Sequence, residues 1–214
     1  QKLEFKKEDI GIVLFPGYGK SGDCYLNLCN HIKDKLKESN INSEIIINNY
    51  FYNLPILGNL QTEYLTKKSM EELNNKNISK IFFIGHSAGS YFLNHIAKKY
   101  GNGFIQMGNV LNSNGLLPWE KISLNNYPIP VLTLLGQKDG YTNFLLGLDE
   151  LNDLNNNTLL KPIIIEKNIN HLQMSDNIKT VLADIVNKKD IISPINNEEA
   201  HERLSSSISE FIKS

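Results

Sequence analysis

One short segment constrains the fold of this chain more than any other. Residues 81–89 read I-F-F-I-G-H-S-A-G, an apolar run that ends in G-x-S-x-G and is followed by a helix-compatible segment. This layout is typical of a strand that turns sharply into a helix and presents one serine, here Ser87, above the edge of a sheet. Gly85 and Gly89 must then be small, because strand and helix approach closely. The alternative is that Ser87 is an ordinary helix N-cap.

The order of the other elements predicts an α/β fold. Strand patterns alternate with helical patterns, which indicates a mostly parallel sheet covered by helices on both faces, with right-handed crossovers. A length of 214 residues with 41% hydrophobic content suits a single domain, residues 1–214. The expected strands are residues 10–15, 41–47, 81–84, 104–110, 131–135 and 163–165, and the expected helices are residues 26–36, 63–73, 88–100, 144–154 and 205–212.

Composition excludes several classes of function. The 22 Lys and Arg residues nearly balance the 23 Asp and Glu residues, so no overall field favours nucleic acid, and no nucleic-acid partner is expected. No apolar stretch approaches the roughly 18 residues of a membrane-spanning helix, so no transmembrane segment is expected. Cys24 and Cys29 lie on different faces of one expected helix and are predicted to be free, buried thiols. Free thiols fit a reducing compartment and favour the cytoplasm, and nothing else in the sequence specifies a location.

A serine nucleophile needs a histidine base, and that histidine needs a carboxylate to fix its tautomer. In an open parallel sheet the reacting groups gather where the strands end. Asp139 follows the expected strand 131–135, and His171 follows the strand 163–165. The chain order Ser87, Asp139, His171 matches the order of serine, acid and histidine that belongs to this architecture.

Each of these residues has an alternative interpretation. Asp139 could be a turn residue before a glycine, and His171 could be a surface loop histidine. Among the remaining histidines, His86 is expected to contact the catalytic residues rather than the substrate. His31, His95 and His201 are expected to be structural or solvent-facing. Their spacing matches no zinc pattern, so no metal is expected. Replacement carboxylates for Asp139 would be Asp149, Glu150 and Asp153, which lie in an expected helix.

The segment P-G-Y-G-K-S-G at residues 16–22 is similar to a phosphate-binding loop. It lacks the first glycine that such a loop requires. Nucleotide binding is therefore not favoured.

These motifs together resemble the α/β-hydrolase fold superfamily, in a lipase- and esterase-like branch, over residues 10–212. The resemblance is carried by G-H-S-A-G, by P-I-P before V-L-T-L-L-G-Q-K-D-G, and by N-H-L-Q-M around His171. It implies a cofactor-free serine hydrolase acting on a small-molecule carboxylic ester, in which Ser87 attacks, His171 is the base and Asp139 orients His171. An acyl-thioesterase would need the same residues. A ligand-binding protein that keeps the fold without turnover is the alternative from another class.

The family pattern also implies two backbone donors for the oxyanion of the intermediate. One is the N–H of Ala88, directly after the serine. The other comes from the loop after the first strand, where Tyr18 is the first choice. Many relatives have His-Gly where this chain has Pro16 and Gly17, which leaves the choice between Tyr18 and Gly19 open.

Members of this superfamily with a large mobile cap usually insert it after the strand that follows the helix behind the serine, here the expected helix 88–100. Here that connection, residues 111–127, is too short for a cap domain, so a minimal cap is expected. Leu116, Leu117 and Trp119, with the apolar loop 50–57, are expected to form the walls of a shallow, open acyl site. The alternative is that both segments only complete the core.

Overall fold

The computed structural model describes residues 8–111, 124–152, 159–176 and 190–214. Its sheet has six strands in the order β2-β1-β3-β4-β5-β6, and all neighbours pair in parallel. The predicted α/β class with a mostly parallel sheet is confirmed. The strands are β1 (Glu8–Phe15), β2 (Ile41–Ile47), β3 (Lys80–His86), β4 (Gly103–Met107), β5 (Val131–Gly136) and β6 (Ile163–Glu166).

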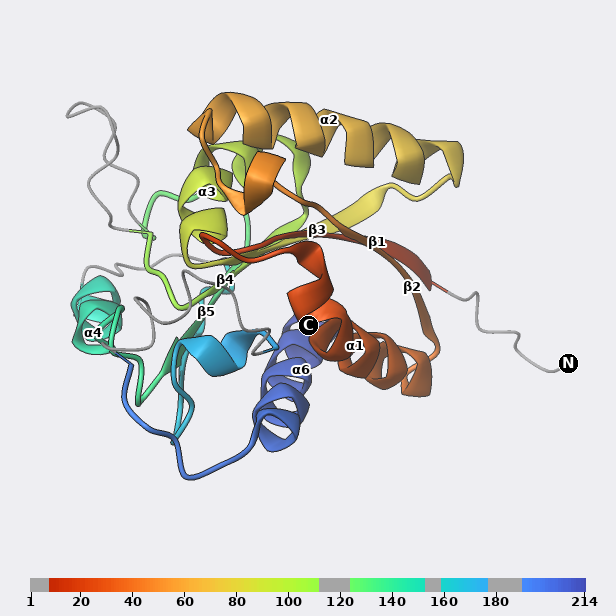
Figure 1. Ribbon diagram of the computed structural model, residues 1–214. Helices are drawn as coiled ribbons and strands as arrows, with labels where there is room; N and C mark the ends of the chain where they lie inside the picture. Colours follow the sequence, from red (N-terminus) through yellow and green to blue (C-terminus); the bar gives the residue numbers. More distant parts are fainter. Residues whose placement is uncertain (1–7, 112–123, 153–158, 177–189) are drawn as a thin grey trace, which may run out of the picture.

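Helices cover both faces of this sheet (Figure 1). Helices α1 and α6 lie on one face, and α2 and α3 lie on the other. Their bounds are α1 (Leu26–Glu38), α2 (Gly58–Asn75), α3 (Ala88–Tyr100) and α6 (Asn197–Lys213), and a further helix, α4 (Leu145–Asn152), follows β5.

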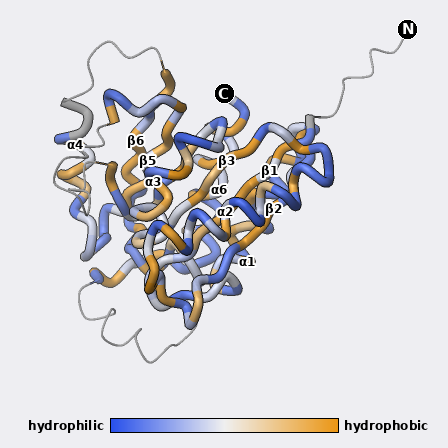
Figure 2. The backbone as a smooth tube through the Cα atoms, turned by 90° about the horizontal axis from the view of Figure 1, so that it is seen from above, coloured by the Kyte–Doolittle hydropathy of each residue, from blue (hydrophilic) through white to orange (hydrophobic). Residues whose placement is uncertain are grey.

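Two hydrophobic clusters hold the layers together. In β1, Ile12 and Leu14 pack toward α1 and α6, whereas Val13 and Phe15 pack toward α2 and α3. Side chains alternate in this way because successive residues of a strand point to opposite faces. Strands β3 and β5 are buried on both faces, so their sequences are largely apolar rather than alternating. Figure 2 shows the same contrast between hydrophobic strands and the more polar outer helices.

None of the described helices combines the length and the apolar character that crossing a bilayer requires. Cys24 and Cys29 are both buried and free, as predicted from their spacing. Both pack in the cluster between the sheet and helices α1 and α6.

Three predicted boundaries were wrong by three residues or more. Helix α2 begins at Gly58 rather than at residue 63. The other two differences have local reasons. Strand β4 ends at Met107 rather than at residue 110, because Gly108 has a positive φ of 58° and its N–H donates to the Leu134 carbonyl. Helix α6 begins at Asn197 rather than at residue 205. The Asn196 side chain caps it by accepting the Glu199 N–H at 2.8 Å.

Candidate active site

Ser87 lies at a sharp turn between β3 and α3. Its φ of 51° and ψ of −119° are strained values for a residue with a side chain. A Cβ at Gly85 would lie 2.5 Å from the Ser90 Cα, and one at Gly89 would lie 2.5 Å from the Phe15 carbonyl oxygen. Both glycines are therefore required by the close approach of strand and helix that the sequence indicates.

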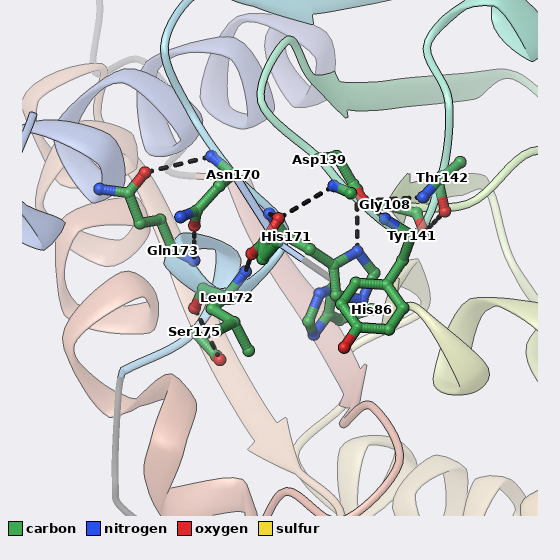
Figure 3. Close-up of polar contacts among 12 residues, drawn as sticks. His86, Gly108, Asp139, Tyr141, Thr142, Asn170, His171, Leu172, Gln173 and Ser175 are labelled. Carbon is green, nitrogen blue, oxygen red and sulfur yellow. Dashed lines mark hydrogen bonds and ion pairs between the residues drawn. The ribbon is translucent and has the colours of Figure 1, made fainter. Parts of the chain in front are cut away.

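Asp139 and His171 come together although they follow different strands. Asp139 lies after β5 and His171 after β6, and His171 Nδ1 is 2.8 Å from Asp139 Oδ2 (Figure 3). The other carboxylate oxygen, Oδ1, accepts the N–H groups of Tyr141 at 2.8 Å and Thr142 at 2.7 Å. A carboxylate held in this way keeps the imidazole proton on Nδ1, which leaves Nε2 of His171 able to accept a proton.

The other candidate carboxylates belong to a different element or lie outside the described part of the chain. Asp149 and Glu150 lie in α4. Asp153 lies outside the described residues.

Ring contacts fix the position of the His171 imidazole. Its centroid is 4.9 Å from that of Tyr141 and 4.7 Å from that of His86. Gly108 lies against the same ring, because a Cβ there would approach His171 Cε1 and Nδ1 to 2.9 Å. The positive φ of Gly108 and this contact both require glycine at the end of β4.

His86 is fully enclosed beside His171. The Tyr25 hydroxyl accepts the Gly17 N–H at 2.9 Å and is hydrogen-bonded to His86 Nδ1 at 2.7 Å. Burial, followed by the positive charges of His171 and Lys20, holds the pKa of His86 well below its usual value. The ring next to His171 is therefore a neutral imidazole at working pH. Sequence reasoning missed Tyr25, which lies beyond the loop that follows β1.

Asp190 is a second residue that sequence reasoning missed. Its carboxylate accepts the N–H groups of Gly140 at 2.9 Å, His171 at 3.2 Å and Leu172 at 2.9 Å. It therefore ties the loop that carries Asp139 to the loop that carries His171. No motif surrounds Asp190 in the sequence, so only the tertiary structure reveals this role.

Backbone contacts distinguish between the two candidate donors in the loop after β1. Pro16 has no N–H, and the Gly17 N–H donates to Tyr25. The Gly19 N–H donates to the Asn53 carbonyl at 2.9 Å, and the Lys20 N–H to the Gly17 carbonyl at 3.2 Å. Of the two candidates, Gly19 is therefore engaged, whereas the Tyr18 N–H has no partner among the described residues. Ala88 begins α3, so its N–H has no acceptor within the helix.

A cavity of about 180 Å³ brings these groups together. Ser87, His171 and Tyr18 all line it, whereas Asp139 is buried and bonded to His171 from outside the lining. The described residues contain no group of three or more His, Cys, Asp or Glu side chains that could hold a metal ion. The complete lining is Gly17, Tyr18, Lys20, His86, Ser87, Tyr141, His171 and Leu172.

The expected acyl walls are only partly described. Leu116, Leu117 and Trp119 lie outside the described residues. In the loop 50–57, Tyr50 is buried in the core, where its ring packs against Phe15. No residue of that loop lines the cavity, and its large apolar residues Phe51, Tyr52, Ile56 and Leu57 are exposed.

Comparisons with known proteins agree with this architecture. No protein-family model matches the chain, and no curated protein sequence matches it. Among solved structures, Est1E from Butyrivibrio proteoclasticus with ferulic acid bound superposes with a TM-score of 0.60 at 11% identity. The match covers 98% of this chain and 92% of that one. Mouse alpha/beta hydrolase domain-containing protein 10 gives 0.60 at 14% identity with the same coverage.

A monoacylglycerol lipase from Paleococcus ferrophilus is similar to the same extent. It superposes with a TM-score of 0.60 at 13% identity, covering 94% of each chain. At these identities the likeness concerns the fold. The parallel sheet, the helices on both of its faces and these neighbours together show that the chain has the α/β-hydrolase fold.

Proposed function

We propose that this protein is a serine hydrolase that cleaves a carboxylic ester of a small molecule through an acyl-enzyme on Ser87. One observation carries the proposal. A serine held at a strained turn shares a cavity with a histidine whose Nδ1 is bonded to a buried carboxylate. This combination provides a nucleophile, a base and a group that orients the base.

In the proposed reaction each of these groups has one role. Nε2 of His171 takes the proton from the Ser87 hydroxyl as Oγ attacks the ester carbonyl, and Asp139 stabilises the imidazolium that forms. The N–H groups of Tyr18 and Ala88 donate to the oxyanion of the tetrahedral intermediate. His171 then protonates the leaving alcohol, and the same residues activate a water that hydrolyses the acyl-enzyme.

The solved structures with the same fold support this choice of reaction class. They include a monoacylglycerol lipase, an esterase from Pyrobaculum calidifontis and the esterase domain of a Rhodothermus marinus protein. The fold hosts other reactions as well, so the assignment to this chain rests on the site itself.

Labelling with a fluorophosphonate probe tests the proposal. This probe reacts with activated serines, so a covalent adduct is expected on the peptide that contains Ser87. Ser87→Ala should give no adduct and should lose ester turnover by about four orders of magnitude or more. Heat-unfolded wild-type protein is the control for nonspecific reaction. A folded protein that stays unlabelled would be a ligand-binding protein without turnover.

The same groups would also cleave an acyl-thioester. A panel of matched esters and thioesters with graded acyl chains separates the two activities. We expect the ester of each pair to be turned over with the higher kcat/KM. A consistent preference for the thioester would make the protein a thioesterase.

A further inference from the structure

Lys20 is a buried lysine beside the reacting groups. Its side chain is only 6% exposed, and it lines the same cavity as Ser87 and His171. Within the described residues its ammonium group makes no hydrogen bond and no ion pair. Burial lowers the pKa of Lys20, and the electrostatic effects of Cys24 and Asp176 oppose that shift. Burying a cation without a partner raises the free energy of the folded protein, because the charge loses its hydration. An anion in contact with the cation offsets much of that free energy.

The rest of the cavity lining leaves this charge unbalanced. The lining contains no Asp or Glu, and Lys20 is its one Lys or Arg among the described residues. Asp139, the carboxylate of the site, is committed to His171, Tyr141 and Thr142. Asp176, whose charge acts on Lys20, lies outside the cavity lining and makes no ion pair with Lys20 among the described residues. The cavity therefore favours a ligand that brings its own negative charge.

The size of the cavity limits where that charge can be. A volume of about 180 Å³ holds roughly six water-sized groups. Because Lys20 and Ser87 line this same small cavity, an anionic group in contact with Lys20 lies close to the carbonyl that Ser87 attacks. A long neutral acyl chain would bury apolar groups against an unpaired ammonium.

We propose that Lys20 binds a carboxylate of the substrate, and that the enzyme selects short anionic esters such as the half-esters of small dicarboxylic acids. This inference rests on the proposed ester hydrolysis. The carboxylate can belong to the acyl group or to the alcohol, and the two arms of the test separate these cases.

The test compares substrates that differ in charge and little in shape. Monomethyl succinate carries a carboxylate on its acyl group, and methyl levulinate replaces that carboxylate by a neutral methyl ketone. Acetoxyacetate carries the carboxylate on the alcohol, and acetoxyacetone is its neutral counterpart. The kcat/KM ratio within each pair is measured for wild type, for Lys20→Met and for Lys37→Met, which removes an exposed lysine of α1.

We expect the wild type to prefer the anionic member of at least one pair by about tenfold to a hundredfold, as a charge-assisted hydrogen bond would provide. The preference should fall to about onefold in Lys20→Met and persist in Lys37→Met. Because Lys20→Met removes a buried unpaired charge, its melting temperature should equal or exceed that of wild type. Wild-type ratios near one in both pairs would overturn the inference, whether or not the variant folds.

A binding measurement separates this inference from the proposed reaction. Calorimetric titration of monomethyl succinate and of acetoxyacetate into Ser87→Ala needs no turnover. Binding that disappears in the double variant Ser87→Ala, Lys20→Met supports the role of Lys20 even if no ester is hydrolysed. The opposite outcome is that neutral and anionic esters are hydrolysed at equal rates, and that Ser87→Ala and the double variant bind the anionic esters equally. This outcome would support the proposed hydrolase and contradict the role of Lys20.

Discussion

At the residue scale, His171 depends on contacts of different kinds. A carboxylate holds its Nδ1, two rings flank its imidazole, and a glycine makes room for it. Only the first of these was predictable from the sequence, because Asp139 and His171 each follow a recognisable strand. The flanking rings of His86 and Tyr141 depend on how distant loops fold over the sheet edge, and no spacing along the chain encodes that.

The contact between Asp139 and His171 can be tested by changing one atom. Asp139→Asn keeps the size of the side chain but replaces one acceptor oxygen by an N–H donor, which cannot hold the proton of His171 Nδ1. We expect kcat to fall by about four orders of magnitude while the fold is retained. Steady-state kinetics on a short-chain ester, with circular dichroism for folding, measure both. Near-normal activity in Asp139→Asn, with loss in Asp149→Asn, would assign the acid to α4.

At the element scale, the sequence located the strands better than the ends of the helices. Strands β2 and β5 follow from their apolar runs, and α3 follows from the glycine-flanked serine before it. The early start of α6 was also predictable from the sequence, because Asn196 followed by Glu199 is a helix-capping signal. The polar first turn of α6 carries few apolar residues, so periodicity alone placed its start too late.

Asp190 links two loops, and its removal should affect rate more than binding. Asp190→Ala leaves the N–H groups of Gly140, His171 and Leu172 without their acceptor, which destabilises the protein by about 1–3 kcal/mol. Misplacement of His171 relative to Ser87 should lower kcat by about tenfold to a hundredfold, with KM changed by less than about threefold.

Asp190→Asn is the matched control. Its amide oxygen can still accept from Gly140 and His171, whose donors share Oδ1 in the wild type, so it should recover most of the lost rate. A purely structural role would lower the melting temperature of Asp190→Ala and leave kcat of the folded enzyme unchanged.

The segment that contains Trp119 carries the prediction about the acyl site. If Leu116, Leu117 and Trp119 form its wall, Trp119→Ala should change the preferred acyl chain length more than it changes stability. A series of p-nitrophenyl esters and a thermal melt measure the two effects. The site should also hydrolyse dissolved esters without an interface, because no large lid is expected. An early melt with an unchanged ester preference, or strong activation above the solubility limit of the substrate, would contradict this prediction.

At the scale of the whole molecule, buried histidines should set the acid limit of stability. His86 and His201 are both buried, and burial is the main cause that lowers the pKa of each. For His201, Asp176 and Glu198 oppose this effect, and His31 adds to it. When the folded pKa lies below the unfolded one, the unfolded chain takes up the proton first as the pH falls. The stability that depends on a neutral histidine is then fully present above about pH 6.5, the pKa of the unfolded chain. It is lost progressively as the pH falls from there to the pKa of the folded state.

Thermal melts between pH 8 and pH 4 test this expectation. The melting temperature of the wild type should be level above about pH 6.5 and should fall between about pH 6.5 and 5. Carboxylates with lowered pKa, such as Glu63 and Glu202, act mainly below about pH 4.5, so the interval between about pH 6.5 and 5 isolates the histidines. In the wild type, Asn27 donates to His201 Nδ1 at 3.1 Å, and the glutamine of His201→Gln can still accept this hydrogen bond. His201→Gln removes one of the two titrating histidines, so its melting temperature should fall less steeply between about pH 6.5 and 5. An unchanged slope in His201→Gln would mean that His201 is not one of the groups that take up a proton on unfolding.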